Sequence, residues 1–84
     1  MADLRADIQN ALTYIEENLT EELEIRDIAK KAFLSPFYFQ RIFGVMCGIS
    51  VGEYIRGRRL TLAGEELASS DVKVIDIAAK YGYD

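Results

Sequence analysis

The sequence predicts an all-α fold of about five helices, and three observations predict it. Apolar residues recur every three or four positions in each long segment of the 84-residue chain. Residues that favour helix caps stand where these segments begin. A nine-residue segment, 27–35, also recurs as 76–84 at a constant offset of 49 (76 − 27 = 49). The repeat predicts two copies of one unit, a short helix followed by a tight turn.

The first two helices follow from apolar spacing. The first segment is apolar at Leu4, Ile8, Ala11, Leu12, Ile15 and Leu19. This spacing predicts a helix over roughly residues 4–18, with Asp3 as its N-cap. Its outer face is expected to carry the acids Asp7, Glu16 and Glu17. A second helix of about two turns is marked by Ile25, Ile28, Ala29 and Ala32.

A third helix is predicted over about residues 36–46. Ser35 is a preferred N-cap, and Pro36 is tolerated in a first helical turn. On a helical wheel the residues of this helix divide into two arcs. One arc is ordinary core material, namely Tyr38, Phe39, Ile42, Phe43 and Met46. The other is expected to be exposed and carries an aromatic ring, an amide, a guanidinium and bare backbone, at Phe37, Gln40, Arg41 and Gly44.

A fourth helix is predicted over about residues 51–68. Gly48 is expected to end the third helix, and Ser50 with Glu53 forms a capping box ahead of the fourth. Its apolar residues form two nearly opposite stripes, with Val51, Tyr54, Ile55 and Leu62 on one side and Leu60, Ala63 and Leu67 on the other. Such a helix is typical of a connector between two small bodies. A fifth helix is expected to begin near Val74 and to reach Gly82.

Composition excludes several classes of function. The chain has no histidine and a single cysteine, Cys47. Ser-His-Asp and Cys-His catalytic arrangements, a Cys/His metal site and an internal disulfide are therefore excluded. We expect no enzyme activity, no metal and no cofactor. No apolar run approaches the roughly 18 residues of a membrane span, and the N-terminus lacks the pattern of a secretory signal. No membrane is expected as a partner, and the expected compartment is the cytoplasm.

The charges are distributed unevenly along the chain. The formal net charge of −4 and the pI near 4.8 are unusual for a nucleic-acid-binding domain. Residues 26–59, however, carry a local charge of +5 (7 − 2), between flanks of −6 (1 − 7) and −3 (2 − 5). Their basic residues are Arg26, Lys30, Lys31, Arg41, Arg56, Arg58 and Arg59. This basic island permits a localised contact with phosphates.

Over residues 8–84 the chain resembles the DNA-binding domain of the AraC/XylS family of bacterial transcription regulators. The resemblance is carried by Ile28-Ala29, Ser35, Phe39, Arg41, Phe43, Gly48, Ser50, Tyr54-Ile55, Arg59-Leu60, Ala63, Leu67, Ile77-Ala78 and Gly82-Tyr83. It implies two homeodomain-like helix-turn-helix units, the first over 1–50 and an incomplete second over 69–84, joined by a linking helix over 51–68. The chain departs from the family pattern at Val51, where proline is usual, at Phe33, where glycine is common, and at Gly44 and Val45, where many members carry lysines.

The resemblance implies a sequence-specific DNA-binding domain whose third helix, about 36–46, inserts in the major groove of double-stranded promoter DNA. Its base-contacting residues would be Phe37, Gln40 and Arg41. Candidate phosphate contacts are Lys30, Lys31, Ser35, Arg56 and Arg59. The alternative for Arg41 is a solvated surface residue, and that for Phe37 is a place in the core. The other cations could equally belong to solvated helix faces, and the stem of Arg58 is expected to pack beside Tyr54 and Ile55.

Further expectations concern partners. The alternative function is a helical protein-interaction module that binds an effector domain or a polymerase subunit through its acidic first helix. Because that helix begins near Met1, any effector-binding domain is expected downstream; RNA polymerase is a candidate partner, and the nucleoid is the expected place of action. The offset of 49 predicts a second base-contacting helix at about residues 85–95. We therefore expect weak, half-site DNA binding from this chain, with Val74, Ile77 and Tyr81 less well covered than in an intact protein that has the second unit complete.

Overall fold

The computed structural model describes residues 3–69 and 71–83, and in these residues the predicted helices are confirmed close to their predicted bounds. The helices are α1 (Leu4–Glu17), α2 (Ile25–Lys31), α3 (Pro36–Cys47), α4 (Val51–Ser69) and α5 (Val74–Lys80). None of the helices described has both the length and the apolar character that a membrane span requires.

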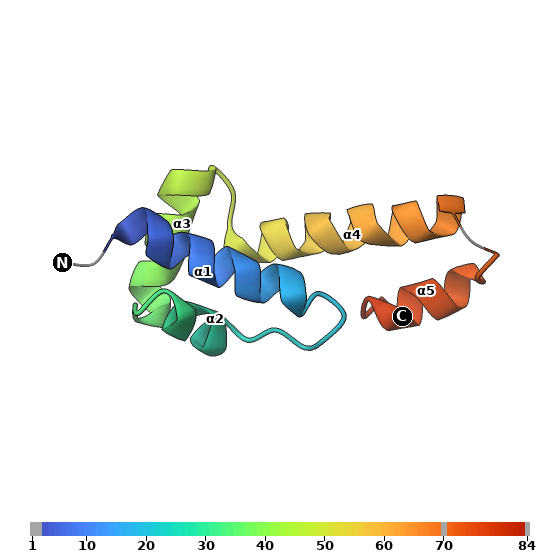
Figure 1. The fold of residues 1–84 in the computed structure, drawn as a ribbon, viewed down its shortest axis with the longest axis horizontal. Coiled ribbons are helices and arrows are strands. Elements are labelled where there is room, and N and C mark those ends of the chain that lie inside the picture. The colour runs from blue at the N-terminus through green and yellow to red at the C-terminus, as the bar shows by residue number, and fades with distance from the viewer. Residues whose placement is uncertain (1–2, 70, 84) are drawn as a thin grey trace.

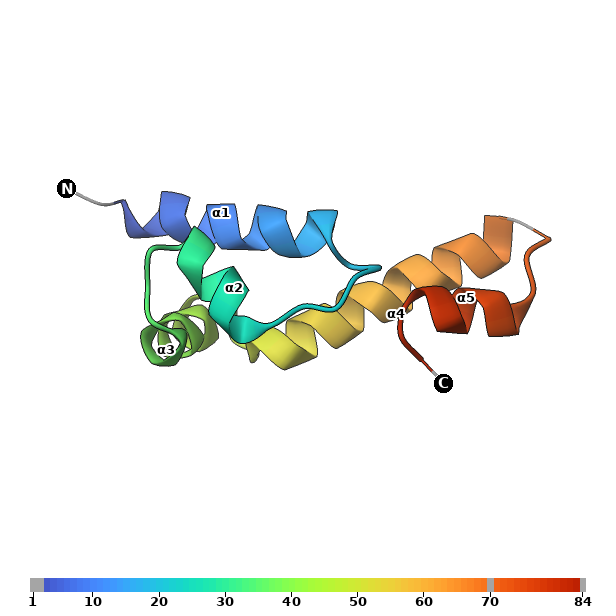
Figure 2. The ribbon, with the colours of Figure 1, turned by 90° about the horizontal axis from the view of Figure 1, so that it is seen from below.

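The molecule is elongated, with extents of 49 × 18 × 18 Å. Helices α1, α2 and α3 gather at one end, and α4 runs lengthwise away from them (Figure 1). Beyond a turn, α5 folds back along the far half of α4, as the view from below also shows (Figure 2). The helix α4 therefore connects two small bodies of unequal size.

Each half of α4 packs into a separate apolar core. The larger core consists of Ile8, Ala11, Ile15, Leu19, Ile28, Ala29, Ala32, Phe39, Phe43, Val51 and Ile55, and the smaller of Ala63, Ile77 and Tyr81. Leu62 packs against both. The prediction that α4 is packed from two sides is confirmed, but Leu60 and Leu67 are 66% and 39% exposed because the smaller core leaves that part of their stripe uncovered.

The three apolar residues of α5 differ in their coverage. Ile77 and Tyr81 are buried, because they pack against Ala63 and Leu62 of α4. The side chain of Val74 is exposed. That all three are less well covered than beside a complete second unit stays a prediction.

Side-chain caps begin two of the helices as predicted. The carboxylate of Asp3 accepts hydrogen bonds from the backbone N–H groups of Arg5 (3.0 Å) and Ala6 (3.5 Å). The hydroxyl oxygen of Ser35 accepts one from the backbone N–H of Tyr38 (3.2 Å). Each bond satisfies an N–H group that the helix itself leaves without a partner.

The connection from α3 to α4 also follows the predicted signals. Gly48 ends α3 in the left-handed conformation, with φ at 77°. The backbone N–H of Glu53 donates to the hydroxyl oxygen of Ser50 (3.1 Å), which is one half of the capping box. The other half differs from the prediction: the Glu53 carboxylate accepts from the Ser50 hydroxyl (3.2 Å) rather than from the backbone N–H of the cap.

The two copies of the sequence repeat form the same backbone turn, one at the end of α2 and the other at the end of α5. In each copy two N–H groups beyond the helix donate back to its last turn. The four bonds are Phe33 N to Lys30 O (3.1 Å), Leu34 N to Ala29 O (3.1 Å), Gly82 N to Ala79 O (3.2 Å) and Tyr83 N to Ala78 O (2.7 Å). Phe33 (φ 56°) and Gly82 (φ 83°) take the left-handed position, which is unfavourable by about 1–2 kcal/mol for a residue with a Cβ. The predicted second cap, Asp84, lies outside the described residues.

Three side chains lie elsewhere than predicted. Asp7, expected on the outer face of α1, is 9% exposed; it lies in the first turn of α1, where the helix dipole favours a carboxylate. Tyr38 and Met46, predicted for the core, are exposed. Phe39 and Phe43 are the fully buried residues of α3, and Ile42 is partly buried against the larger core, so the arc that faces the core is narrower than the helical wheel suggests.

The carboxylate of Glu16 on α1 binds two side chains of α4. Glu16 accepts hydrogen bonds from the Tyr54 hydroxyl (3.1 Å) and from Nε and Nη2 of Arg58 (3.1 and 2.9 Å). We call these three residues the Glu16 cluster. The hydrogen bonds from Arg58 hold the pKa of Glu16 below its ordinary value, and burial, together with the hydrogen bond to Glu16, raises the pKa of Tyr54. Arg58 therefore pairs with an acid, a contact that the prediction of a packed stem did not include.

Arg59 strengthens the same attachment. Its Nε donates to the backbone carbonyl of Leu19 (2.9 Å) and its Nη2 to that of Glu21 (2.7 Å). A cation just beyond the C-terminal end of α1 also complements the dipole of that helix. The guanidinium predicted to contact phosphate is thus bound to the loop between α1 and α2 in this structure.

We predict that Glu16→Gln lowers the free energy of unfolding at neutral pH by about 0.5–1 kcal/mol, a modest value because the pair is partly exposed and screened by solvent. The folded state holds the pKa of Glu16 below 4.5, so the ionised cluster stabilises the fold above that value and stops doing so as the pH falls through the folded-state pKa.

Urea unfolding of both proteins across this pH range measures the effect, and the difference between them should shrink toward acid. Glu17→Gln, on the next residue of α1, is the matched control and should leave stability unchanged. A difference between wild type and Glu16→Gln that is constant with pH would contradict the ionic origin.

Candidate nucleic-acid interface

One side of α3 is an exposed strip made of the predicted base-contacting residues. Phe37, Gln40 and Arg41 are all exposed, Phe37 by 61%. On the opposite side, Phe39 and Phe43 are fully buried and anchor the helix to the larger core. The structure therefore brings the three residues together and turns them outward, and the alternative that Phe37 belongs to the core does not hold.

The side chains of this strip contact one another and their own helix. The guanidinium of Arg41 lies over the Phe37 ring, 5.6 Å from its centroid, a cation–π arrangement. The amide nitrogen of Gln40 donates to the backbone carbonyl of Pro36 (3.2 Å). These contacts are solvent-exposed and weak, so they orient the side chains and can be exchanged for contacts with a partner.

The strip continues along α3 as bare backbone at Gly44. A Cβ placed on Gly44 would meet no atom within 4 Å. Glycine is therefore not required there by packing, and any side chain at this position would extend the strip into open space.

Acidic residues neutralise only part of the basic island. Arg26 pairs with Glu24 (3.2 Å), and Arg58 pairs with Glu16 (2.9 Å). Four cations of this island are exposed and form no ion pair within the described residues, namely Lys30, Lys31, Arg41 and Arg56. Residues 28–52 contain no Asp or Glu at all. Positive charge therefore persists around α3 although the whole chain is acidic.

The predicted phosphate contacts differ in how they are held. The Lys31 ammonium lies 5.0 Å from the centroid of the Tyr14 ring on α1, whereas Lys30 is simply exposed. The Ser35 hydroxyl accepts the cap hydrogen bond and keeps its own proton for donation. Arg56 is exposed on α4. That these residues and Arg59 contact phosphate stays a prediction.

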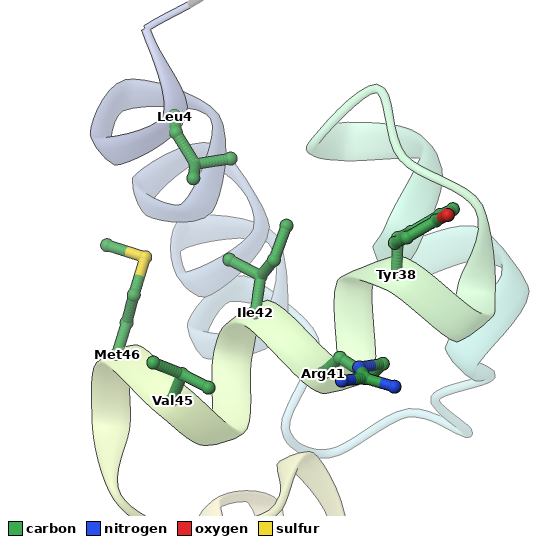
Figure 3. Close-up of a pocket in the computed structure, with 6 residues that line it drawn as sticks. All are labelled: Leu4, Tyr38, Arg41, Ile42, Val45 and Met46. Carbon is green, nitrogen blue, oxygen red and sulfur yellow. The ribbon is translucent and has the colours of Figure 1, made fainter.

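An apolar groove beside the strip was not predicted (Figure 3). It has a volume of about 260 Å³ and is lined by Leu4, Tyr38, Arg41, Ile42, Val45 and Met46. The close-up shows Leu4 of α1 opposite Ile42 and Met46 of α3. The signal that could have revealed the groove is Val45, an apolar residue that belongs to neither arc of the helical wheel and is 86% exposed.

Comparison with known sequences places the chain among regulators. A family model described as a helix-turn-helix domain matches residues 28–84. The HTH-type transcriptional activator AarP of Providencia stuartii is 43% identical over 77 residues, which cover 92% of this chain and 57% of that protein. Regulatory protein SoxS of Salmonella typhimurium is 41% identical over 76 residues, covering 90% of this chain and 71% of that protein. The chain thus spans little more than half the length of AarP.

A solved structure shares the fold. A transcriptional regulator from Chromobacterium violaceum, described as a protein with an AraC-type DNA-binding domain, has a TM-score of 0.87 at 24% identity. The match covers 95% of this chain and 71% of that one. The arrangement of helices around α4 is therefore common to both proteins.

We predict that Gly44→Ala stabilises the chain by about 0.5–1 kcal/mol, because alanine favours a helix and the added methyl group meets open space. Gly48→Ala is the matched control: it also meets no atom within 4 Å, but φ is 77° there and the change should destabilise. Thermal unfolding of both variants measures the two shifts. Destabilisation by Gly44→Ala would show that the strip is packed rather than open.

Proposed function

The chain is a DNA-binding domain that belongs to the AraC/XylS family of bacterial helix-turn-helix transcription regulators, and we propose that α3 is the helix with which it enters the major groove of promoter DNA. The exposed strip on α3 carries this proposal. In a helix-turn-helix pair the second helix lies in the groove with exposed side chains toward the base edges. Here α2 and α3 form such a pair, joined by the turn at Phe33.

Each residue of the strip has a defined chemistry toward bases. The guanidinium of Arg41 can donate two hydrogen bonds to the O6 and N7 atoms of guanine, and the amide of Gln40 can pair with adenine. The ring of Phe37 can contact the methyl group of thymine. Each bidentate pair contributes about 1–3 kcal/mol of discrimination against the wrong base. The present bond from Gln40 to the Pro36 carbonyl would then be exchanged for the one to adenine.

Phosphates would be bound on either side of the strip. Lys30, Lys31 and Arg56 are exposed cations without an ion pair among the described residues, and the Ser35 hydroxyl is free to donate its proton. Arg59 is the least supported of the predicted contacts, because its Nε and Nη2 already donate to backbone carbonyls. Phosphate contacts fix the position of the domain on the duplex, whereas the strip selects the sequence.

The match with AarP covers 57% of that protein, so the activity of a whole regulator is a proposal for this chain. We propose for it the properties of a transcription regulator that acts at the nucleoid in the cytoplasm and catalyses no reaction. A second base-contacting helix at about residues 85–95 is proposed from the repeat offset of 49, and an effector-binding domain and contact with RNA polymerase are proposed from the resemblance alone.

The test is a titration of this chain with a duplex selected from a random pool and with a scrambled duplex, at several salt concentrations. The logarithm of the association constant should fall linearly with the logarithm of salt, with a slope near −2.7 if three phosphates are neutralised. Binding that does not depend on salt, or that does not distinguish the two duplexes, would overturn the proposal.

Two variants separate the roles of the residues. Arg41→Ala should cost about 1–3 kcal/mol on the selected duplex and little on the scrambled one, because a base contact is lost. Lys30→Ala should weaken binding to both duplexes by a similar factor and make the salt slope shallower by about 1, because a phosphate contact is lost. Equal effects of the two variants on both duplexes would contradict the assignment.

A further inference from the structure

The turn between α2 and α3 holds an aromatic residue where the backbone favours glycine. Phe33 has a φ of 56°, and the hydrogen bonds around it match those around Gly82 in the second copy of the turn. The two turns therefore have one geometry, built with glycine in one copy and with phenylalanine in the other. The Cβ of Phe33 makes that copy the more strained of the two.

No contact of the Phe33 side chain within the described part of the chain offsets this strain. The Phe33 side chain is 79% exposed and belongs to neither apolar core. The Phe33 ring makes no aromatic or cation–π contact with another described residue, whereas the Phe37 ring contacts both Tyr38 and Arg41. Strained positions of this kind persist where function requires them, so the ring of Phe33 is expected to be used by a partner.

The surroundings of Phe33 indicate the chemistry of that partner. Lys30 and Lys31 directly precede the turn, and both are exposed without an ion pair in the described residues. The turn lies in the acid-free segment 28–52, and the cap of α3, Ser35, follows it by two residues. An apolar ring that directly follows two cations in the chain suits a polyanion that also has apolar faces, and the sugar-phosphate backbone of DNA has both.

We propose that Phe33 is a DNA contact outside the base-reading strip, and that its ring packs against deoxyribose at the edge of the groove that α3 enters. This inference rests on the proposed function of α3. The flanking lysines would hold the phosphates on either side of the sugar, and the contact carries no base specificity because every nucleotide has the same sugar.

The experiment measures stability and affinity of Phe33→Gly in the 84-residue chain. The melting temperature should rise by roughly 4 °C or more, because glycine relieves the strain. The dissociation constants for the selected and the scrambled duplex should both rise, by about fivefold and by the same factor, because an apolar contact common to both is lost. A more stable protein that binds DNA less tightly is the combination that a purely structural role of Phe33 does not produce.

Three further variants complete the test. Phe33→Asn, a second ring-free residue that tolerates the left-handed conformation, should weaken binding as Phe33→Gly does. Phe33→Tyr retains the ring and should keep wild-type affinity. Leu60→Ala, the matched control, removes an apolar side chain that is 66% exposed on α4 and should leave affinity unchanged.

Three outcomes would overturn the contact. Unchanged affinity of Phe33→Gly for both duplexes would mean that the ring serves another partner, such as a protein. A loss confined to the selected duplex would mean that the ring contacts a base. If the wild-type chain shows no salt-dependent binding to either duplex, the DNA-binding function itself is overturned and the Phe33 contact with it.

Discussion

The attachment of α4 to α1 determines where every later part of the molecule lies. Glu16 binds Arg58 and Tyr54, and Arg59 binds two carbonyls at the end of α1. The nineteen residues of α4 then carry the smaller core away from the larger one, so a small change in direction at the Glu16 cluster becomes a large displacement at α5. A polar attachment suits this purpose because hydrogen bonds define direction, whereas apolar contacts tolerate sliding.

The far half of α4 is held by similar chemistry. Glu66 accepts hydrogen bonds from the ammonium of Lys80 (2.7 Å) and from the hydroxyl of Tyr81 (2.5 Å). The bond from Lys80 is the main reason that the pKa of Glu66 lies below its ordinary value. A carboxylate, a cation and a tyrosine thus meet in both halves of the linking helix. In this arrangement one acid from each acidic flank of the basic island is held against a cation of the chain itself.

Most of the fold, and the exposed strip, could be predicted because the signals are local. A cap such as Ser35, a stop such as Gly48 and the outward side of α3 depend on residues within one or two turns. The Glu16 cluster could not be predicted, because Tyr54 and Arg58 lie 38 and 42 positions away along the chain. The binding of Arg59 was missed for the same reason: charge and spacing do not distinguish a cation that meets phosphate from one that meets a backbone carbonyl. Contact between the strip and DNA itself stays a prediction.

The two cores differ in the number of residues that they bury, so the two halves of the molecule open at different free energies. Three buried residues, Ala63, Ile77 and Tyr81, hold α5 against α4, whereas the larger core draws on four helices. Segments with few buried contacts open at a fraction of the free energy of global unfolding. We therefore expect the amide hydrogens of α5 to exchange with solvent through local detachment of that helix, and those around Phe39 and Phe43 to exchange through global unfolding. We therefore expect the half that carries the exposed strip of α3 to stay folded while α5 detaches from α4 and returns.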